Sequence, residues 1–234
     1  MSLTLPETGF VVLVDKPYGW TSFQVVNKTR WLLKKLTGIK KIKVGHAGTL
    51  DPLATGLMVL CVGKMTKQIS LLTADEKEYQ ATGCFGRWSP SFDLEKRTIE
   101  THPTPNFNAK QFENCIEKFR GKQLQKAPIF SAKKIDGKRA YLSARAGEKV
   151  EIKANEIEIF YLNADASKWP NVNLHIHCSK GTYIRSLVND LGACYGTNAV
   201  LTALRRTRSG NYKLSEAVKI SELKAHLASK LTQG

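Results

Sequence analysis

The segment GHAGTLDPLATG, residues 45–56, holds a single acidic residue, Asp51, among glycines and small or apolar residues. Glycines allow turn conformations and the close approach of a ligand, and Pro52 restricts the backbone after the acid. The segment leads into the apolar run LMVLCV at 57–62, which predicts a buried strand that would hold Asp51 rigidly. A carboxylate in this setting could act as a nucleophile if a distant arginine kept it ionised. An ordinary Asp-Pro turn between two strands is the structural alternative.

Two other segments offer partners for such a carboxylate. The run CSKGTYIRSLVNDLG, residues 178–192, predicts a strand-to-helix turn with Tyr183 and Arg185 at the start of the helix. Arg185 is the candidate partner, although a surface helix charge is its default interpretation. Tyr79 lies in the alternating segment 77–86, which predicts a strand. Most strand tyrosines pack in a core, but a base taken out of its stack needs a flat surface such as a tyrosine ring.

The strongest global signal is the positive charge of the chain. There are 36 lysines and arginines against 20 acidic residues, which gives a net charge of +16 and a pI near 9.7. Such a charge attracts polyanions, chiefly nucleic acid. The segment LRRTRSG, residues 204–210, concentrates three arginines, and phosphate contact is at least as plausible there as a solvated face. The residues we expect to contact an RNA backbone are Arg205, Arg206, Arg208 and Lys180.

Several other chemistries are disfavoured. The segment VGKMTK at 62–67 resembles a phosphate-binding loop, but Met58 and Met65 stand where that motif needs glycine and serine or threonine. His175 and His177 alternate on one predicted strand without a third ligand nearby, so we expect them on a solvent-facing or RNA-facing strand. A metal-dependent nuclease needs clustered carboxylates, and the acid in segment 45–56 has no acidic neighbour within twenty residues. We expect no metal and no nucleotide cofactor.

Length and composition indicate a folded protein. The chain has 234 residues, of which 42% are hydrophobic and 24% charged. Its apolar runs are shorter than the ~20 residues of a membrane span, and no signal peptide is evident. Five scattered cysteines argue against a disulfide scaffold or a zinc site and favour the reducing cytoplasm.

The elements that must position these residues mix helices and strands without strict alternation. This pattern predicts an α+β fold with a largely antiparallel sheet. Strands are expected at 10–14, 57–62, 77–86, 156–162 and 172–178, with a hairpin at the Asp-Gly turn in 131–141. Helices are expected after a Thr21 or Ser22 cap, through Ile69 and Leu72, after Asn108, after a Thr182 cap, and over 220–231. The first of these helices should bury Phe23, Val26, Thr29, Leu33 and Leu36.

At this point the motifs match a known family. Six blocks occur in the order seen in the TruB family of tRNA pseudouridine synthases, and they extend over nearly the whole chain. The blocks are DKPYGWTSF, GHAGTLDPLATGLMVLCVGKMTK, KEYQATGCFG, APIFSAKKIDGKRAYLSARAG, CSKGTYIRSLVNDLG and LRRTRSGNY. The sequence resembles this family most specifically around Asp51.

The resemblance implies the pseudouridine-synthase fold, in which a central, mostly antiparallel mixed sheet is flanked by helices and loops. It implies a substrate, uridine 55 in the tRNA T-loop, that is flipped out of the loop. Asp51 matches the catalytic aspartate, which attacks or deprotonates the ribose so that the glycosidic bond breaks. Tyr79 matches the tyrosine that packs on the base, and Arg185 matches the arginine paired with the aspartate.

The resemblance also assigns the residues around the base. Tyr183 and Leu204 match pocket residues, and His46 matches a histidine that fills the space left by the base. Lys16 matches a lysine that supports the loop structure near the site. The reaction is an isomerisation, so no metal, nucleotide or redox cofactor is implied. The expected partner is the T-loop and stem of tRNA, with a monomeric protein, no protein partner and no membrane.

Two departures from the family pattern stand out. After residue 86, family members often carry a Thr/Asp-rich stretch, whereas this chain has RWSPSFDLEK with Asp93 as the only similar acid. Many relatives also continue into an RNA-binding module of the PUA type, which we expect to be absent here. The expected organisation is a catalytic domain over 1–214 and a short helical tail over 215–234. The alternative functions are a non-catalytic tRNA-binding or folding chaperone of the same fold, and a metal-dependent nuclease.

Overall fold

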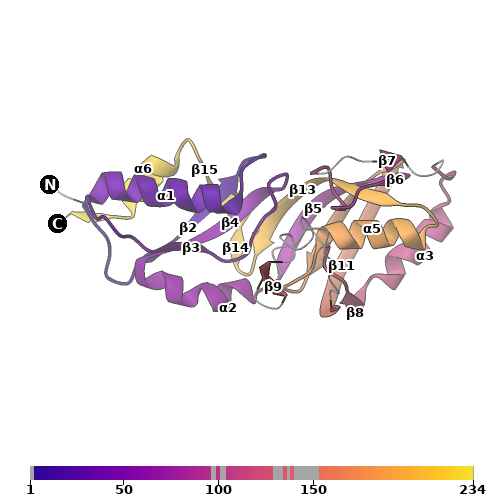
Figure 1. Ribbon diagram of the computed structural model, residues 1–234, viewed down its shortest axis with the longest axis horizontal. Coiled ribbons are helices and arrows are strands. Elements are labelled where there is room, and N and C mark those ends of the chain that lie inside the picture. Colours follow the sequence, from indigo (N-terminus) through magenta and orange to yellow (C-terminus); the bar gives the residue numbers. More distant parts are fainter. Residues whose placement is uncertain are drawn as a thin grey trace. The chain divides into compact units, whose positions relative to one another are not determined.

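The computed structural model describes residues 3–95, 99–100, 104–128, 134–135, 138–139 and 153–233 (Figure 1). These residues form two compact units. The first unit comprises Met1–Glu78 together with Arg205–Gly234, and the second comprises Tyr79–Leu204. Strands β5 (Lys77–Phe85) and β13 (Ala199–Ser209) contribute residues to both units.

The first unit is built on strands in the order β15-β2-β4-β13. β2 (Phe10–Lys16) runs antiparallel to β4 (Thr55–Val62), and β3 (Val44–His46) also pairs with β4. β15 (Val218–Lys219) is parallel to β2, and β13 is parallel to β4. β4 is buried along almost its whole length, as its unbroken apolar sequence predicts for a strand covered on both faces.

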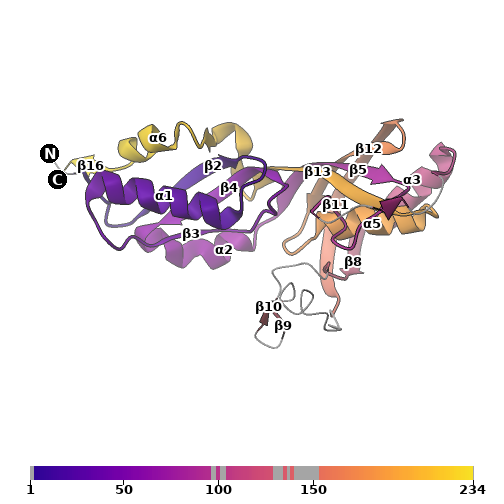
Figure 2. The same ribbon diagram turned by 45° about the horizontal axis from the view of Figure 1, so that its top comes forward.

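Three helices belong to the first unit, namely α1 (Ser22–Thr37), α2 (Ile69–Thr73) and α6 (Leu223–Ser229) (Figure 2). The 3-10 helix η1 (Gly63–Gln68) precedes α2. Thr21 caps α1, because its hydroxyl accepts from the Gln24 backbone and the Gln24 side chain accepts in return. The chain ends also meet in this unit, where β1 (Leu3–Thr4) pairs with β16 (Thr232–Gln233).

The second unit contains strands in the order β13-β5-β12-β11-β8. β11 (Asn155–Lys168) is antiparallel to both β12 (Asn171–Cys178) and β8 (Gly121–Gln125). Helices α3 (Ala109–Lys118) and α5 (Ile184–Cys194) lie side by side in both ribbon views (Figures 1 and 2). An aromatic cluster links the two helices, because Phe112 lies on α3 and Tyr195 directly follows α5. Its ring centroids lie 5.1–6.2 Å apart, and it is formed by Phe85, Phe107, Phe112, Trp169 and Tyr195.

Short elements complete the two units. β6 (Arg87–Trp88) pairs with β7 (Ile99–Glu100), and β9 (Lys134–Ile135) pairs antiparallel with β10 (Lys138–Arg139). β14 (Tyr212–Lys213) pairs with β13 and is followed by the 3-10 helix η2 (Leu214–Glu216). The β9–β10 pairing agrees with the predicted hairpin, whereas the Asp-Gly turn itself lies outside the described residues.

The α+β class and the mixed, mostly antiparallel sheet are confirmed, but some local predictions are wrong. Val26, Thr29 and Leu33 of α1 are buried as expected, but Phe23 is 64% exposed, and Val25 and Leu32 complete the buried face. The cap of α5 is Tyr183 rather than Thr182, whose hydroxyl donates to the Ser179 carbonyl. The last helix is shorter than 220–231, although Leu223 and Leu227 are buried as expected. The division between residues 214 and 215 stays a prediction.

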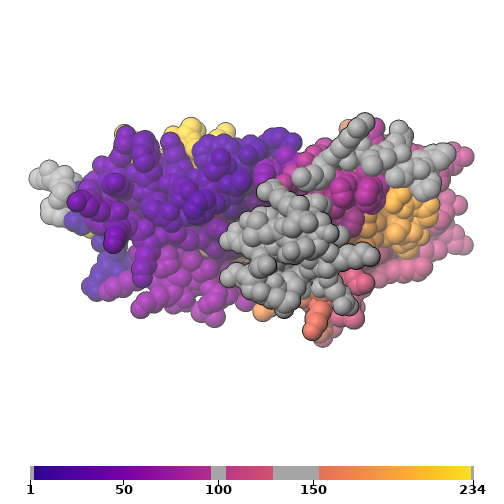
Figure 3. Space-filling view, viewed as in Figure 1, coloured from indigo at the N-terminus to yellow at the C-terminus, as the bar shows by residue number. Residues whose placement is uncertain are grey.

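The surface view shows the side of the first unit that carries α1 and α2 (Figure 3). Among the described residues, no helix is both long and apolar enough to cross a membrane.

Candidate active site

Asp51 lies half-buried in the first unit, in the segment 45–56 that we call the acid loop. Its carbonyl accepts from the Ala54 backbone N–H at 3.1 Å, which closes a tight turn. On the preceding side, the buried Ser22 hydroxyl donates to the Leu50 carbonyl at 2.9 Å and accepts from the Leu50 N–H at 2.8 Å. The start of α1 therefore holds the backbone next to Asp51.

Lys16 holds the other side of the acid loop. Its side chain is fully buried at the end of β2, and its ammonium donates to the carbonyls of Pro17, Trp20 and Pro52 at 2.5–3.2 Å. An ammonium has three N–H donors, so these three carbonyls use all of them. Because Pro52 directly follows Asp51, Lys16 joins the acid loop to the turn after β2.

Arg206 is the second buried cation beneath the acid loop. Only 1% of it is exposed, and its guanidinium donates to the Leu57 carbonyl at 2.7 Å and to the Gly48 carbonyl at 3.2 Å. Its backbone pairs with Gly56 in the parallel β4–β13 register. Gly56 has φ of +100°, and a Cβ there would lie 2.7 Å from the Arg206 backbone nitrogen. Glycine is therefore required at this position for both conformation and space.

Two pKa shifts reflect this crowding of positive charge. Burial lowers the pKa of Lys16 from 10.5 to about 8, with Asp51 opposing the shift and Arg206 adding to it. Burial also lowers the pKa of His46, and the Arg206 charge lowers it further. Both effects favour the neutral form of the His46 ring. The structure thus brings Lys16, His46, Asp51 and Arg206 together in the first unit.

Arg185 lies in the second unit and is buried, so its default interpretation as a surface helix charge is wrong. Its Nη1 donates to the Ser91 carbonyl at 3.0 Å and lies 3.6 Å from the Asp93 carboxylate, which is also buried. The segment RWSPSFDLEK thus supplies a carboxylate to Arg185 that sequence reasoning did not assign. The one available signal was that Asp93 is the only aspartate in a stretch where family members often carry threonines and aspartates.

The start of α5 is fixed by the buried Gln125. Its amide accepts from the Tyr183 N–H at 2.8 Å and donates to the Tyr183 carbonyl at 3.1 Å. Tyr79 is buried on β5, Leu204 is half-buried on β13, and Lys180 is exposed in the turn before α5. These residues belong to the second unit, so the expected pairing of Asp51 with Arg185 stays a prediction.

The arginines of β13 have different environments. Arg205 pairs with Asp15 at 2.8 Å, and Arg208 pairs with Glu78 at 2.7 Å, each with a partly exposed side chain. Because Arg206 is buried, it does not lie on the surface where we expected it to contact phosphate. Its hydrogen bonds to backbone carbonyls support the acid loop instead. Alternation along a strand explains why the adjacent Arg205 and Arg206 differ, because neighbouring side chains point to opposite faces.

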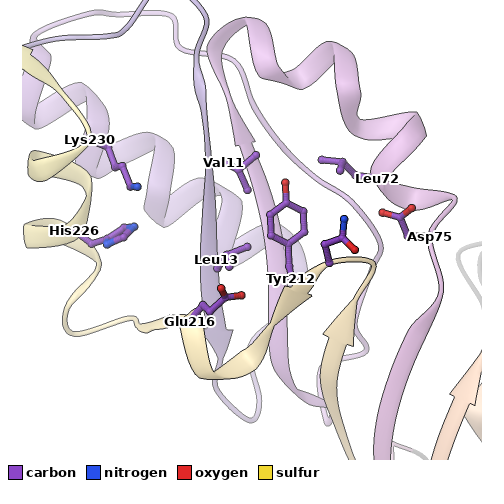
Figure 4. Close-up of a pocket in the computed structure, with 9 residues that line it drawn as sticks. Val11, Leu13, Leu72, Asp75, Tyr212, Glu216, His226 and Lys230 are labelled. Atoms are coloured by element: carbon purple, nitrogen blue, oxygen red, sulfur yellow. The ribbon is translucent and has the colours of Figure 1, made fainter.

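The first unit also contains a cavity of about 510 Å³ away from these residues (Figure 4). Tyr212 stands between Leu72 and Asp75 on one side and Val11 and Leu13 on the other (Figure 4). His226 on α6 and Lys230, which follows this helix, line the cavity beyond Val11 and Leu13. It contains none of the expected site residues. In the second unit, His175 and His177 pack against Tyr161 and Phe160 on the more exposed face of β12. Among the described residues, no group of three potential ligands could hold a metal ion.

Comparisons with known proteins identify the family. The profile of the TruB family pseudouridylate synthase N-terminal domain matches residues 34–184, and that of the tRNA pseudouridylate synthase B C-terminal domain matches residues 185–233. The chain is 47% identical to tRNA pseudouridine synthase B of Phocaeicola vulgatus, covering 92% of this chain and 91% of that protein. It is 46% identical to tRNA pseudouridine synthase B of Flavobacterium johnsoniae, covering 91% and 93% respectively.

Solved structures give the same fold. A Cbf5-Nop10-Gar1 complex contains a chain that matches with a TM-score of 0.70 and 25% identity, over 94% of this chain and 55% of that one. An archaeal box H/ACA sRNP Nop10-Cbf5 complex matches with a TM-score of 0.67 and 21% identity, over 97% and 60%. This chain thus spans little more than half the length of those structural relatives. From the family profiles and the curated relatives, the chain belongs to the TruB family of pseudouridylate synthases and is an isomerase.

Proposed function

We propose that this enzyme converts uridine 55 in the T-loop of tRNA to pseudouridine, with Asp51 as the catalytic carboxylate. The observation that carries the proposal is the support of Asp51 from three directions. Ser22 holds Leu50, Lys16 holds Pro52, and Arg206 holds Gly48 and Leu57. A carboxylate fixed in this way is preorganised for attack on a bound group, as nucleophilic catalysis requires.

In the proposed reaction, the uridine is flipped out of the T-loop before chemistry begins. Asp51 attacks the ribose or removes a ribose proton, and the bond between C1′ and N1 breaks. The free uracil turns, and a bond forms between C1′ and C5. The proton lost from C5 is balanced by the proton gained at N1, so the RNA keeps its composition. No redox agent or water molecule is consumed, and we propose that no metal or cofactor takes part.

The other site residues position the nucleotide in this proposal. Tyr79 packs on the base and assists removal of the C5 proton, while Arg185 pairs with the Asp51 carboxylate. Tyr183 and Leu204 line the base pocket. His46 takes the space that the base leaves in the T-loop, and its lowered pKa suits a role for a neutral ring.

The net charge of +16 supports tRNA as the partner. Arg205, Arg208 and Lys180 are the proposed phosphate contacts, whereas Arg206 acts on the acid loop from below. We propose that the protein acts as a monomer in the cytoplasm without a protein partner. Within it, residues 1–214 would form the catalytic domain and residues 215–234 a short helical tail.

The test uses purified protein and an unmodified tRNA transcript. Cyanoethylation followed by mass spectrometry should find one pseudouridine, at position 55, and a transcript with cytidine at that position should gain none. Pseudouridine at another position would overturn the site specificity. Faster tRNA folding without modification would identify a chaperone, and RNA cleavage that EDTA stops would identify a nuclease.

A further inference from the structure

A second cavity in the first unit, of about 320 Å³, lies at the end of β2. It is lined by Asp15, Lys16, Pro17, Thr55, Arg205, Lys219, Ile220 and Ser221. This volume falls at the lower end of the range for small-molecule sites and can hold part of a nucleotide. Lys16 and Thr55 connect the cavity to the acid loop, since Lys16 binds the Pro52 carbonyl and Thr55 belongs to the loop.

The sheet register gathers these residues. Lys219 on β15 pairs with Asp15 on β2, and Arg205 on β13 pairs with Thr55 on β4. In parallel strands, residues in register project to the same face, so Lys219 and Asp15 are neighbours. The cavity wall is therefore built on strands rather than on loops alone, which favours a fixed geometry for a ligand.

The positive charge in the cavity is suited to a phosphate. Arg205 donates to Asp15 at 2.8 Å and to Thr55 at 3.3 Å, which engages two of its five N–H groups. Lys219 is exposed and forms no ion pair among the residues that the structure describes. Its backbone N–H donates to the Glu222 carboxylate at 3.0 Å, and its backbone carbonyl accepts from the Glu222 N–H at 3.0 Å. The Lys219 ammonium and the remaining N–H groups of Arg205 can thus contact an anion.

The carboxylate of Asp15 supplies the complementary feature. Its Oδ2 accepts from Arg205, whereas its Oδ1 is buried and has no hydrogen-bond partner among the described residues. A buried acceptor without a donor costs free energy, and a ligand hydroxyl would satisfy it. A phosphate next to a hydroxyl is the chemistry of a ribonucleotide, and the 2′-hydroxyl distinguishes RNA from DNA.

We propose that this cavity binds one ribonucleotide of the substrate RNA outside the reacting uridine. Lys219 and Arg205 contact its phosphate, and Asp15 Oδ1 accepts from its 2′-hydroxyl. The inference rests on the proposed function for RNA as the ligand, and it adds a backbone contact next to the acid loop. It also gives the enzyme a means of preferring RNA over DNA at a position that is not chemically changed.

The first test compares Lys219→Gln with Lys230→Gln, a matched loss of one exposed charge in the same unit, at the cavity of Figure 4. Binding of a T-arm hairpin RNA is measured by fluorescence anisotropy at several salt concentrations. Lys219→Gln should weaken binding about fivefold and reduce the slope of log Kd against log salt by about one, as expected for one lost phosphate contact. Lys230→Gln should change Kd less than about twofold. Equal effects of the two variants would overturn the proposal.

The second test changes the RNA and leaves the protein intact, so it does not depend on a variant that folds. Single 2′-deoxy substitutions are placed at each nucleotide of the hairpin except the target uridine. One of these deoxy substitutions should weaken binding to the wild-type enzyme several-fold. Asp15→Ala should bind the RNA with this substitution as tightly as it binds the parent RNA. If every deoxy substitution binds like the parent RNA, Asp15 does not read a 2′-hydroxyl.

A free mononucleotide is the other source of the same chemistry. Uridine monophosphate that competes with the hairpin in the wild-type enzyme but not in Lys219→Gln would assign the cavity to free nucleotides and overturn the proposal. Pseudouridine formation by the wild-type enzyme is measured in parallel. Failure of the proposed function would appear as no product with the wild type, whereas failure of this inference would leave the product intact and Lys219→Gln equal to its control.

Discussion

The two units hold their candidate catalytic charges, Asp51 in the first unit and Arg185 in the second, by different kinds of contact. In the first unit, two buried cations, Lys16 and Arg206, hold the backbone around Asp51 by binding the carbonyls of Pro52, Gly48 and Leu57. In the second unit, the cation of Arg185 rests against a buried acid, Asp93, and one carbonyl. The first arrangement fixes a backbone, and the second fixes a side chain.

This difference predicts different consequences of mutation. Removing a cation under the acid loop leaves carbonyls without donors, which costs free energy but leaves no buried charge. Removing Asp93 takes a buried carboxylate away from the buried Arg185 guanidinium, which we expect to cost more free energy than the loss of donors to carbonyls. The second unit should therefore lose more stability from the loss of Asp93 than the first unit loses from the removal of one of these cations.

Asp93→Ala should have the largest effect on stability. Breaking a buried ion pair by removing one partner costs about 3–5 kcal/mol, because the remaining charge stays desolvated. Urea denaturation should show a loss of this size in the free energy of unfolding, while Glu95→Ala, an exposed acid two residues away, should change it by less than about 0.5 kcal/mol. Equal losses for the two variants would mean that the Arg185–Asp93 pair contributes no more to stability than an exposed acid does.

Gly56→Ala should cause the second largest loss of stability, because Gly56 is where the acid loop contacts the backbone of Arg206. The added Cβ meets the Arg206 backbone and the position has φ of +100°, so we expect a cost of about 2–4 kcal/mol. Gly19→Ala is the control, because Gly19 has φ of +80° but an added Cβ would meet nothing within 4 Å. Thermal unfolding should separate the two by about 1–2 kcal/mol. If Gly19→Ala lost as much free energy of unfolding as Gly56→Ala, the loss would come from the backbone conformation alone and not from the contact with Arg206.

The smallest expected effect is a pH dependence that arises at Lys16. Above pH 8 its ammonium loses a proton, and the neutral amine has two N–H donors for three carbonyls. The rate of pseudouridine formation should fall modestly as pH rises through about 8, and this step should be missing in Lys16→Gln. If the rate of Lys16→Gln fell equally through pH 8, the step would arise from the titration of another group.

Stability should respond to the same titration with the opposite sign. The folded-state pKa of Lys16 is about 8, below its ordinary value of 10.5, so the unfolded chain binds more protons between these values. The contribution of Lys16 to the free energy of unfolding therefore rises from pH 8 to 10.5. The difference between wild type and Lys16→Gln in denaturation curves across this range checks the sign.

Local signals in the sequence predicted much of the fold. The Thr21 and Asn108 caps, the apolar run of β4 and the alternation of β5 depend on neighbouring residues, and the structure confirms them. The phase of α1 was wrong at Phe23, because a helical stripe fixes the buried face only to within one residue to either side.

The environments of the charged residues were harder to predict. Arg206 and Arg185 look like surface charges because arginine is usually exposed. Their burial depends on Leu57, Gly48, Ser91 and Asp93, all of which lie more than ninety residues away in the chain. Composition indicated an RNA partner, but only the fold shows which arginines are on the surface and which support the acid loop.

The catalytic role of Asp51 is tested by its replacement with asparagine, with Asp75→Asn as the control. Asp75 is also a half-buried carboxylate of the first unit, but it lines the cavity of Figure 4. Single-turnover formation of pseudouridine in the T-arm hairpin should fall on the order of 10⁴-fold in Asp51→Asn and stay near the wild-type rate in Asp75→Asn. Affinity for the RNA should remain within about threefold of the wild type in both variants. Pseudouridine formation by Asp51→Asn at the wild-type rate would contradict the central claim that this carboxylate performs the chemistry.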